Sequence, residues 1–193
     1  MSRLLVNACP RGAASRTLRL AEHATGLLGG GFERLDVYRE GIVSLTPQTL
    51  EKRLALCAEG RFDDPLFAPA RRFREAETVV IAAPYWDLSF PAALKALVEQ
   101  LCVIGLTFFY DESDQPRSLC RLKRFLYVTT AGGPILSDEP GFGYLKLVMR
   151  TFFGAEKCVQ IKAEGLDLRG ADAEAILRKA MREAERLLAP AHS

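Results

Sequence analysis

The chain has 193 residues, of which 49% are hydrophobic and 26% are charged. This composition is typical of globular proteins and excludes an intrinsically disordered chain, and the length predicts one domain over residues 1–193. Lysine plus arginine (26) nearly balances aspartate plus glutamate (24), and the resulting net charge of +2 argues against a dedicated nucleic-acid-binding protein.

The apolar segments predict no membrane association. The longest stretch without a charged residue, residues 125–137, contains two threonines and two glycines and is too short to cross a bilayer. The apolar run at residues 4–9 is shorter than the core of a signal peptide and includes Asn7. We therefore expect a cytosolic protein.

The first half of the chain alternates apolar runs with segments of helical periodicity. Residues 15–28 place apolar side chains on one helical face, and three consecutive glycines then end that helix. Thr46 and Pro47 are typical of a helix N-cap and of the first helical position. These patterns predict strands at residues 3–8 and 32–37 and helices at residues 15–28, 47–59 and 67–75.

The second half continues the alternation. The run TVVIAA at residues 78–83 is β-branched and apolar on both faces, as in a central parallel strand. The patterns predict further strands at residues 125–130 and 158–163 and helices at residues 91–101, 141–153 and 171–188. Strands that alternate with helices predict an α/β fold, a doubly wound five-stranded parallel sheet with helices on both faces.

In such a sheet, ligands bind beyond the carboxyl ends of the strands. The loop after the first strand, residues 9–17, precedes a helix whose free N–H groups attract anions, and it carries Arg11, Ser15, Arg16 and Thr17. It lacks both the GK[ST] ending of a P-loop and the GxGxxG fingerprint. The loop therefore predicts a phosphate site or, alternatively, an ordinary helix cap with solvated arginines.

Two further strand ends are unusual. Residues 84–90 (PYWDLSF) include three aromatic residues, which suit a planar ligand or, alternatively, cap the sheet edge. Residues 130–133 (TAGG) allow close approach to the backbone or form an ordinary turn.

Histidine and cysteine are too sparse for the commonest catalytic and metal sites. The two histidines, His23 in a predicted helix and His192 in the C-terminal tail, do not suffice for a histidine-based triad or a multi-histidine metal site. Among the five cysteines the closest pair is 18 residues apart, so a zinc site or a disulfide framework is not expected. Any reaction must therefore draw its chemistry from elsewhere than histidine or cysteine side chains.

Together these segments resemble the flavodoxin-like NAD(P)H:quinone oxidoreductases, and most closely the FMN-dependent NADH-azoreductases. The block AAPYWDLSFPAALKALVEQLCVIGLTFFYD (residues 82–111) is similar to the strand, flavin-ring loop and helix of that family. NACPRGAASRT resembles its phosphate loop and TTAGG its second ring-contacting loop. FFG at residues 152–154 and AEG at residues 163–165 extend the resemblance over most of the chain.

The resemblance implies a flavodoxin-like fold with strand order 2-1-3-4-5 and a homodimer with two FMN sites at its interface. The FMN phosphate is then expected at Ser15, Arg16 and Thr17, with Cys9 and Arg11 in the same loop. The flavin ring is expected along Pro84, Tyr85, Trp86, Asp87 and Leu88 and, at its other edge, along Thr130, Ala131, Gly132 and Gly133. Phe108 and Phe152 match positions that shape the substrate pocket.

The chain departs from the family pattern at three of these positions. Cys9 replaces a serine found in many members, which weakens one phosphate contact. Asp87 introduces a carboxylate that disfavours an anionic reduced flavin if it faces the ring. Ala131 replaces a longer side chain.

The resemblance implies an enzyme that passes a hydride from NADH or NADPH through FMN to a quinone, an azo compound or a similar small-molecule acceptor. The cofactor performs this chemistry, so no catalytic side chain is assigned. The alternatives are an FMN reductase that releases reduced flavin, a flavodoxin-type electron carrier without turnover of its own, and a flavin-free protein that kept the fold. The nearly neutral charge argues against the carrier, since such proteins are usually acidic.

Overall fold

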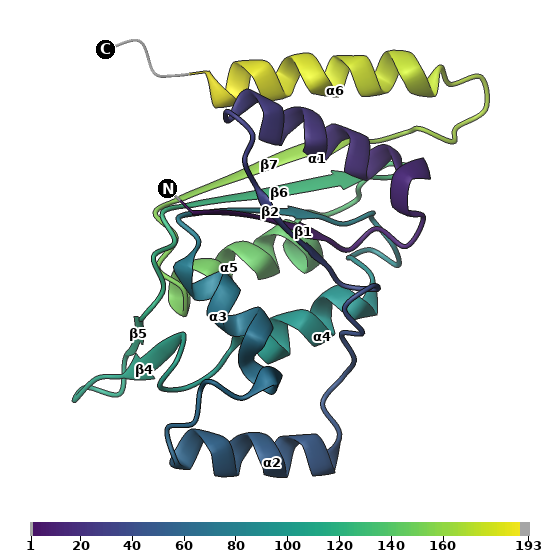
Figure 1. The fold of residues 1–193 in the computed structure, drawn as a ribbon. Coiled ribbons are helices and arrows are strands. Elements are labelled where there is room, and N and C mark those ends of the chain that lie inside the picture. The colour runs from purple at the N-terminus through teal and green to yellow at the C-terminus, as the bar shows by residue number, and fades with distance from the viewer. Residues whose placement is uncertain (1, 190–193) are drawn as a thin grey trace.

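The computed structural model describes residues 2–189 and contains a five-stranded parallel sheet (Figure 1). Its order is β2-β1-β3-β6-β7, and each neighbouring pair is parallel. The strands are β1 (Arg3–Asn7), β2 (Glu33–Asp36), β3 (Thr78–Ala82), β6 (Arg124–Thr130) and β7 (Lys157–Ala163). This arrangement confirms the predicted order 2-1-3-4-5, because β6 and β7 are the fourth and fifth strands of the sheet.

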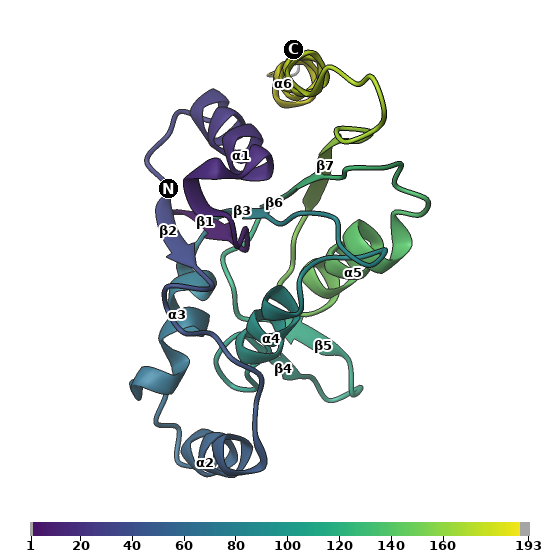
Figure 2. The same cartoon turned by 90° about the vertical axis from the view of Figure 1, so that its right-hand side faces the viewer.

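Helices cover both faces of the sheet, as predicted. In both views α1 and α6 lie on one face, and α3, α4 and α5 lie on the other (Figures 1 and 2). The helices are α1 (Arg16–Leu27), α2 (Pro47–Ala58), α3 (Ala68–Glu75), α4 (Ala92–Leu101), α5 (Tyr144–Thr151) and α6 (Ala173–Leu188). The predicted N-cap of α2 is confirmed, since the Thr46 hydroxyl accepts a hydrogen bond from the amide of Thr49.

Two hydrophobic cores lie on the two faces, because successive side chains of a strand point to opposite sides. In β3, Val79 and Ile81 are buried with α3, α4 and α5, whereas Val80 and Ala82 are buried with α1 and α6. All four side chains are fully buried. This burial on both faces explains why the strand lacks alternating polar residues.

Helix α2 occupies a separate position. In both views it lies beyond α3 and α4, away from the sheet (Figures 1 and 2). It is held by a smaller third core of Leu56, Phe67, Ala70, Val103 and Leu106.

A hairpin between α4 and β6 was not predicted. Its strands β4 (Phe108–Tyr110) and β5 (Pro116–Ser118) pair antiparallel, and the Asp111 carboxylate accepts hydrogen bonds from the amides of Ser113 and Gln115 in the turn. Strands of three residues are too short to show a periodicity. The only cue that the sequence offers for this hairpin is an acidic turn after an aromatic run.

The predicted helix over residues 141–153 begins with a different geometry. Glu139–Gly143 form a π-helical turn, and α5 follows it. Gly141 and Gly143 lie in this turn, and glycine disfavours a regular helix start through its backbone freedom.

The described part of the chain contains no helix with the length and apolar character needed to cross a bilayer. His23 lies on α1 with its Nε2 atom 3.4 Å from the carboxylate of Glu185 on α6. It therefore faces the neighbouring helix instead of open solvent. His192 lies outside the described residues.

Candidate functional site

The three unusual strand ends meet in one polar cavity at the carboxyl edge of the sheet. The cavity has a volume of about 270 Å³. It is lined by Pro10, Arg11, Ser15, Arg16, Thr17, Pro84, Tyr85, Trp86, Thr130, Gly132 and Asp167. Nine of these eleven residues belong to the set expected from the sequence to bind the cofactor, and Pro10 and Asp167 are additions.

The N-terminus of α1 supplies hydrogen-bond donors to this cavity. Ser15 is the N-cap, and its hydroxyl accepts a hydrogen bond from the amide of Leu18 at 3.2 Å. The amides of Arg16 and Thr17 belong to the first turn, where the helix itself offers no acceptor carbonyl. These two amides, together with the positive end of the helix dipole, favour an anion.

Thr17 holds the helix against the sheet. Its hydroxyl lies 2.6 Å from the Thr130 hydroxyl at the end of β6, and both residues are buried. This hydrogen bond joins two of the predicted loops across 113 residues of sequence.

Arg16 pairs with a residue that the sequence reasoning missed. Its Nη2 atom lies 2.8 Å from an oxygen of Asp167, in the loop that follows β7. The amide of Asp167 donates to the carbonyl of Gly132 at 2.9 Å. Asp167 follows the fifth strand of the sheet, so the strand-end rule applied to that strand would have found it.

The aromatic loop forms a tight turn. Trp86 and Ser89 exchange backbone hydrogen bonds of 3.2 and 2.8 Å, and Asp87 and Leu88 between them have φ values of 48° and 66°. Non-glycine residues rarely adopt this left-handed conformation, and such strain concentrates at functional sites. The Asp87 and Leu88 side chains are exposed and do not line the cavity.

Tyr85 anchors the aromatic loop to β6. Its amide donates to the carbonyl of Thr130 at 2.9 Å, and its side chain contributes to the cavity wall. Its hydroxyl is buried and has no hydrogen-bond partner within residues 2–189.

Three further candidates lie at these loops without lining the cavity. Cys9 is buried, and its thiol donates to the carbonyl of Ala82 at 3.4 Å. Burial raises the pKa of Cys9 to about 11, so the thiol is neutral at ordinary pH. Ala131 is buried and its amide bonds the carbonyl of Ala163, while Gly133 accepts a hydrogen bond from the amide of Gly165.

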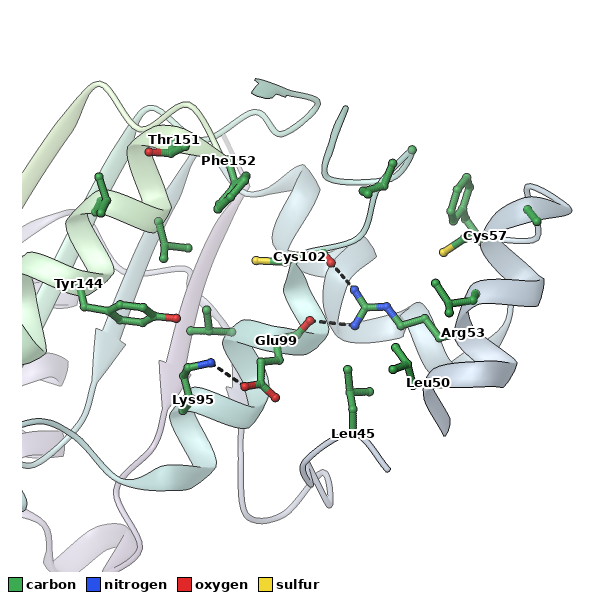
Figure 3. Close-up of a pocket in the computed structure, with 18 residues that line it drawn as sticks. Leu45, Leu50, Arg53, Cys57, Lys95, Glu99, Cys102, Tyr144, Thr151 and Phe152 are labelled. Carbon is green, nitrogen blue, oxygen red and sulfur yellow. Dashed lines mark hydrogen bonds and ion pairs between the residues drawn. The ribbon is translucent and has the colours of Figure 1, made fainter. Parts of the chain in front are cut away.

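The two predicted substrate-pocket residues lie at a second, larger cavity. Phe152 lines it, and the ring of buried Phe108 lies 4.7 Å from the Phe152 ring, centroid to centroid. We call this cavity the apolar groove; it lies between α2, α4 and α5 and has a volume of about 1230 Å³ (Figure 3). It is lined mainly by apolar and aromatic side chains, among them Leu45, Leu50, Leu54, Val98, Ile104, Tyr144, Leu147 and Val148.

Polar contacts in the apolar groove fasten α2 to α4. The Arg53 guanidinium donates to the carbonyl of Glu99 at 2.8 Å and to the carbonyl of Cys102 (Figure 3). A further ion pair lies within α4 itself, where Lys95 contacts the Glu99 carboxylate at 2.6 Å. Burial lowers the pKa of Arg53 and raises that of the Cys102 thiol to about 11.

Comparisons of this chain with known proteins agree on one family. A family model described as "Flavodoxin-like fold" matches residues 1–188. An FMN-dependent NADH:quinone oxidoreductase 2 of Clostridium acetobutylicum is 36% identical over 96% of this chain and 97% of the relative. A relative named FMN-dependent NADH:quinone oxidoreductase, from Caldicellulosiruptor saccharolyticus, is 34% identical over 97% of this chain and 98% of its own.

Solved structures agree on the fold. An azoreductase from Bacillus anthracis str. Sterne superimposes with a TM-score of 0.79 at 24% identity and covers 97% of this chain and 99% of its own. An FMN-dependent NADH-azoreductase of Bacillus anthracis str. Ames Ancestor, solved in complex with FMN, gives a TM-score of 0.79 at 21% identity, covering 97% and 98% of the two chains. With a family model over nearly its whole length and these relatives, the chain belongs to the flavodoxin-like family of FMN-dependent NADH:quinone oxidoreductases.

Proposed function

We propose that this protein is an FMN-dependent oxidoreductase that takes electrons from NADH or NADPH and delivers them to a quinone, an azo compound or a similar small-molecule acceptor. The observation that carries the proposal is the polar cavity at the carboxyl edge, in which the three predicted loops come together. The names of the curated relatives support the same cofactor and reaction class.

The chemistry of the cavity fits the phosphate of FMN. Two first-turn amides of α1 and the side chains of Arg11 and Arg16 supply donors and positive charge. The Ser15 and Thr17 hydroxyls are already engaged, in the helix cap and in the hydrogen bond to Thr130. In our proposal they position the phosphate-binding backbone, and the amides and arginines bind the phosphate itself.

The adjoining wall suits an aromatic ring. Tyr85 and Trp86 line the same cavity as the helix N-terminus, so one ligand can reach both parts. The two backbone hydrogen bonds between Trp86 and Ser89 hold this loop in its strained turn at Asp87 and Leu88. When bound, FMN would supply the two-electron redox chemistry between the nicotinamide and the acceptor. The protein binds and orients the partners, and no side chain is assigned a proton-transfer role.

The test is the visible absorption spectrum of the purified protein with FMN, followed by anaerobic addition of NADH or NADPH. We expect a bound-flavin spectrum that bleaches with a nicotinamide and recovers with a quinone, and the faster nicotinamide identifies the preferred donor. FMN without protein under the same conditions is the control.

Other outcomes of this experiment would support one of the alternative functions. A bound flavin that neither nicotinamide bleaches indicates an electron carrier. Turnover of added FMN that the protein does not retain indicates an FMN reductase. If the protein binds no flavin, the proposal is wrong and only the fold remains.

We further propose that a second copy of the chain covers the apolar groove. Within one chain, nine candidate cofactor residues line the polar cavity, whereas Phe152 lines the apolar groove and Phe108 packs against the Phe152 ring. The apolar groove also leaves Leu54, Ile104 and Leu147 more than half exposed, which is costly in water. A homodimer buries these side chains and completes each site with residues of the partner, as the family resemblance implies.

The mass in solution tests the dimer directly. We expect light scattering after size-exclusion chromatography to give twice the mass of the chain at micromolar concentration. A monomer that still binds and turns over FMN would contradict the dimer and leave the oxidoreductase proposal intact. The cytosolic location expected from the sequence stays a prediction.

A further inference from the structure

Asp167 is the single acidic residue among the described residues that line the polar cavity. A carboxylate is an unfavourable neighbour for a phosphate, because two negative charges repel at short distance. Its presence in a cavity with two arginines and a helix N-terminus therefore needs an explanation.

Asp167 forms an ion pair with Arg16. The Arg16 guanidinium lies 2.8 Å from one Asp167 oxygen and also donates to the carbonyl of Leu166 at 3.4 Å. The pair bridges α1 and the loop after β7, which are 151 residues apart in sequence. The side chains of Arg16 and Asp167 are 27% and 63% exposed, so the aspartate can turn toward solvent without disturbing the core.

Backbone hydrogen bonds hold the Asp167 carboxylate close to the loop at residues 130–133. The amides of Gly165, Leu166 and Asp167 donate to the carbonyls of Gly133, Ala131 and Gly132 at 2.9–3.2 Å. A Cβ atom built on Gly132 would lie 2.5 Å from an Asp167 oxygen. Glycine at position 132 thus leaves the space in which the carboxylate reaches Arg16.

We propose that Asp167 is a charged latch that competes with the phosphate of FMN for Arg16 and so sets the affinity of the cavity for phosphorylated flavins. This inference rests on the proposed function. Without a ligand, Asp167 neutralises Arg16 and holds its guanidinium at the rim of the cavity. A phosphate that binds there must draw Arg16 away from Asp167 and face the released carboxylate.

The chain provides a matched control pair. Arg19 and Glu174 form a two-pronged ion pair at 2.8 and 3.0 Å between α1 and α6, one helical turn beyond Arg16. Neither residue lines the polar cavity. Glu174→Gln removes the same charge from the same part of the molecule but leaves the latch intact.

The experiment compares FMN with riboflavin, which has the same ring system and no phosphate. The apoprotein is titrated with each flavin, and the quenching of flavin fluorescence gives the dissociation constant. We expect Asp167→Asn to lower the dissociation constant for FMN roughly fivefold, the size of a single charge interaction screened by water. The value for riboflavin should stay within about twofold, because riboflavin has no charge for the latch to oppose.

Two further variants complete the test. Asp167→Ala removes the hydrogen bond as well as the charge and should also tighten FMN binding selectively. Arg16→Gln should weaken FMN binding and leave riboflavin binding nearly unchanged. Circular dichroism confirms that each variant is folded.

The outcomes separate the latch from the proposed function. FMN binding that the Asp167 variants weaken or leave unchanged would overturn the latch, as would equal tightening of riboflavin or the same effect from Glu174→Gln. A wild-type protein that binds neither flavin would overturn the proposed function, and the latch with it.

Discussion

The polar cavity at the carboxyl edge and the apolar groove between α2, α4 and α5 differ in what holds their walls in place. Hydrogen bonds and an ion pair between distant segments fix the cavity, through Thr17 with Thr130 and Arg16 with Asp167. Apolar side chains from several helices form the groove, and two of its leucines, Leu54 and Leu147, remain more than half exposed.

This difference fits our proposals that the polar cavity binds a ligand and that the apolar groove forms an interface. Directional contacts hold donors at fixed positions before a ligand arrives, as recognition of a charged group requires. A broad apolar surface has little directional preference and gains free energy when it is covered. We therefore expect substitutions in the cavity to change ligand affinity and substitutions in the groove to change assembly.

The largest expected effect comes from placing charges in the apolar groove. The double variant Leu54→Glu, Leu147→Glu buries two carboxylates in each half of the proposed interface, and the side chains it replaces are 61% and 66% exposed in one chain. We expect the dimer dissociation constant to rise by at least about a thousandfold, or about 4 kcal/mol, as measured by analytical ultracentrifugation. Leu27→Glu, at an exposed leucine on α1, is the control. An unchanged dimer would show that the interface lies elsewhere.

The pH dependence of stability allows one cysteine thiol from each region to be compared, buried Cys9 at the carboxyl edge and half-buried Cys102 in the apolar groove. Burial raises the pKa of both Cys9 and Cys102 from 9.0 to about 11, so the unfolded thiols ionise before the folded ones. The stabilisation is complete below pH 9 and is lost as the pH rises toward 11. Each thiol should lower the free energy of unfolding by up to about 1.4 kcal/mol per pH unit in that interval.

Urea unfolding at pH 8, 9 and 10 measures this decline. Cys9→Ala and Cys102→Ala should each make it shallower by a similar amount. If Cys102→Ala keeps the wild-type slope of stability against pH while Cys9→Ala makes it shallower, water reaches the Cys102 thiol in the apolar groove but does not reach Cys9.

Arg53 tests how firmly the outer wall of the groove is attached. Arg53→Met keeps the apolar stem but removes the donors to the carbonyls of Glu99 and Cys102. We expect the free energy of unfolding to fall by about 2 kcal/mol, because two partly buried carbonyls lose a charged donor. Arg61→Met, at an exposed pair with Glu59, should cost little in the same denaturant titration. Equal costs for the two variants would contradict a special role for Arg53.

The smallest of these effects is expected at the hydrogen bond between Thr17 and Thr130. Thr17→Val keeps the shape but leaves the buried Thr130 hydroxyl without this partner, at a cost of about 1–2 kcal/mol. Thr17→Ser retains a hydroxyl and should recover most of the loss in thermal unfolding. If FMN binding is weakened more by Thr17→Val than by Thr17→Ser, the hydrogen bond also positions the phosphate-binding turn. Identical stabilities for the two variants would argue against that contact.

Much of the carboxyl edge could be predicted from the sequence because its cues are local. An apolar run marks a strand, a change of period marks the following helix, and parallel strands bring their carboxyl ends to one edge. Loops that contain Arg16, Tyr85 and Gly132 therefore had to lie near one another, and they line one cavity. The sequence could not show that the Cys9 and Asp87 side chains do not line the cavity, because position in a loop does not decide which way a side chain faces.

Taken alone, the sequence patterns determined the order of strands and helices, the parallel α/β class and three of the loops around the polar cavity, and the family resemblance added the flavodoxin-like strand order. Only the tertiary structure decided that Asp167 pairs with Arg16, that α2 lies beyond α3 and α4, and that a groove opens beside it. The physical reason is the range of the interactions: hydrophobic periodicity and capping act within a few residues. An ion pair across 151 residues, or a groove lined by three helices, depends on how whole elements pack, which no local pattern encodes.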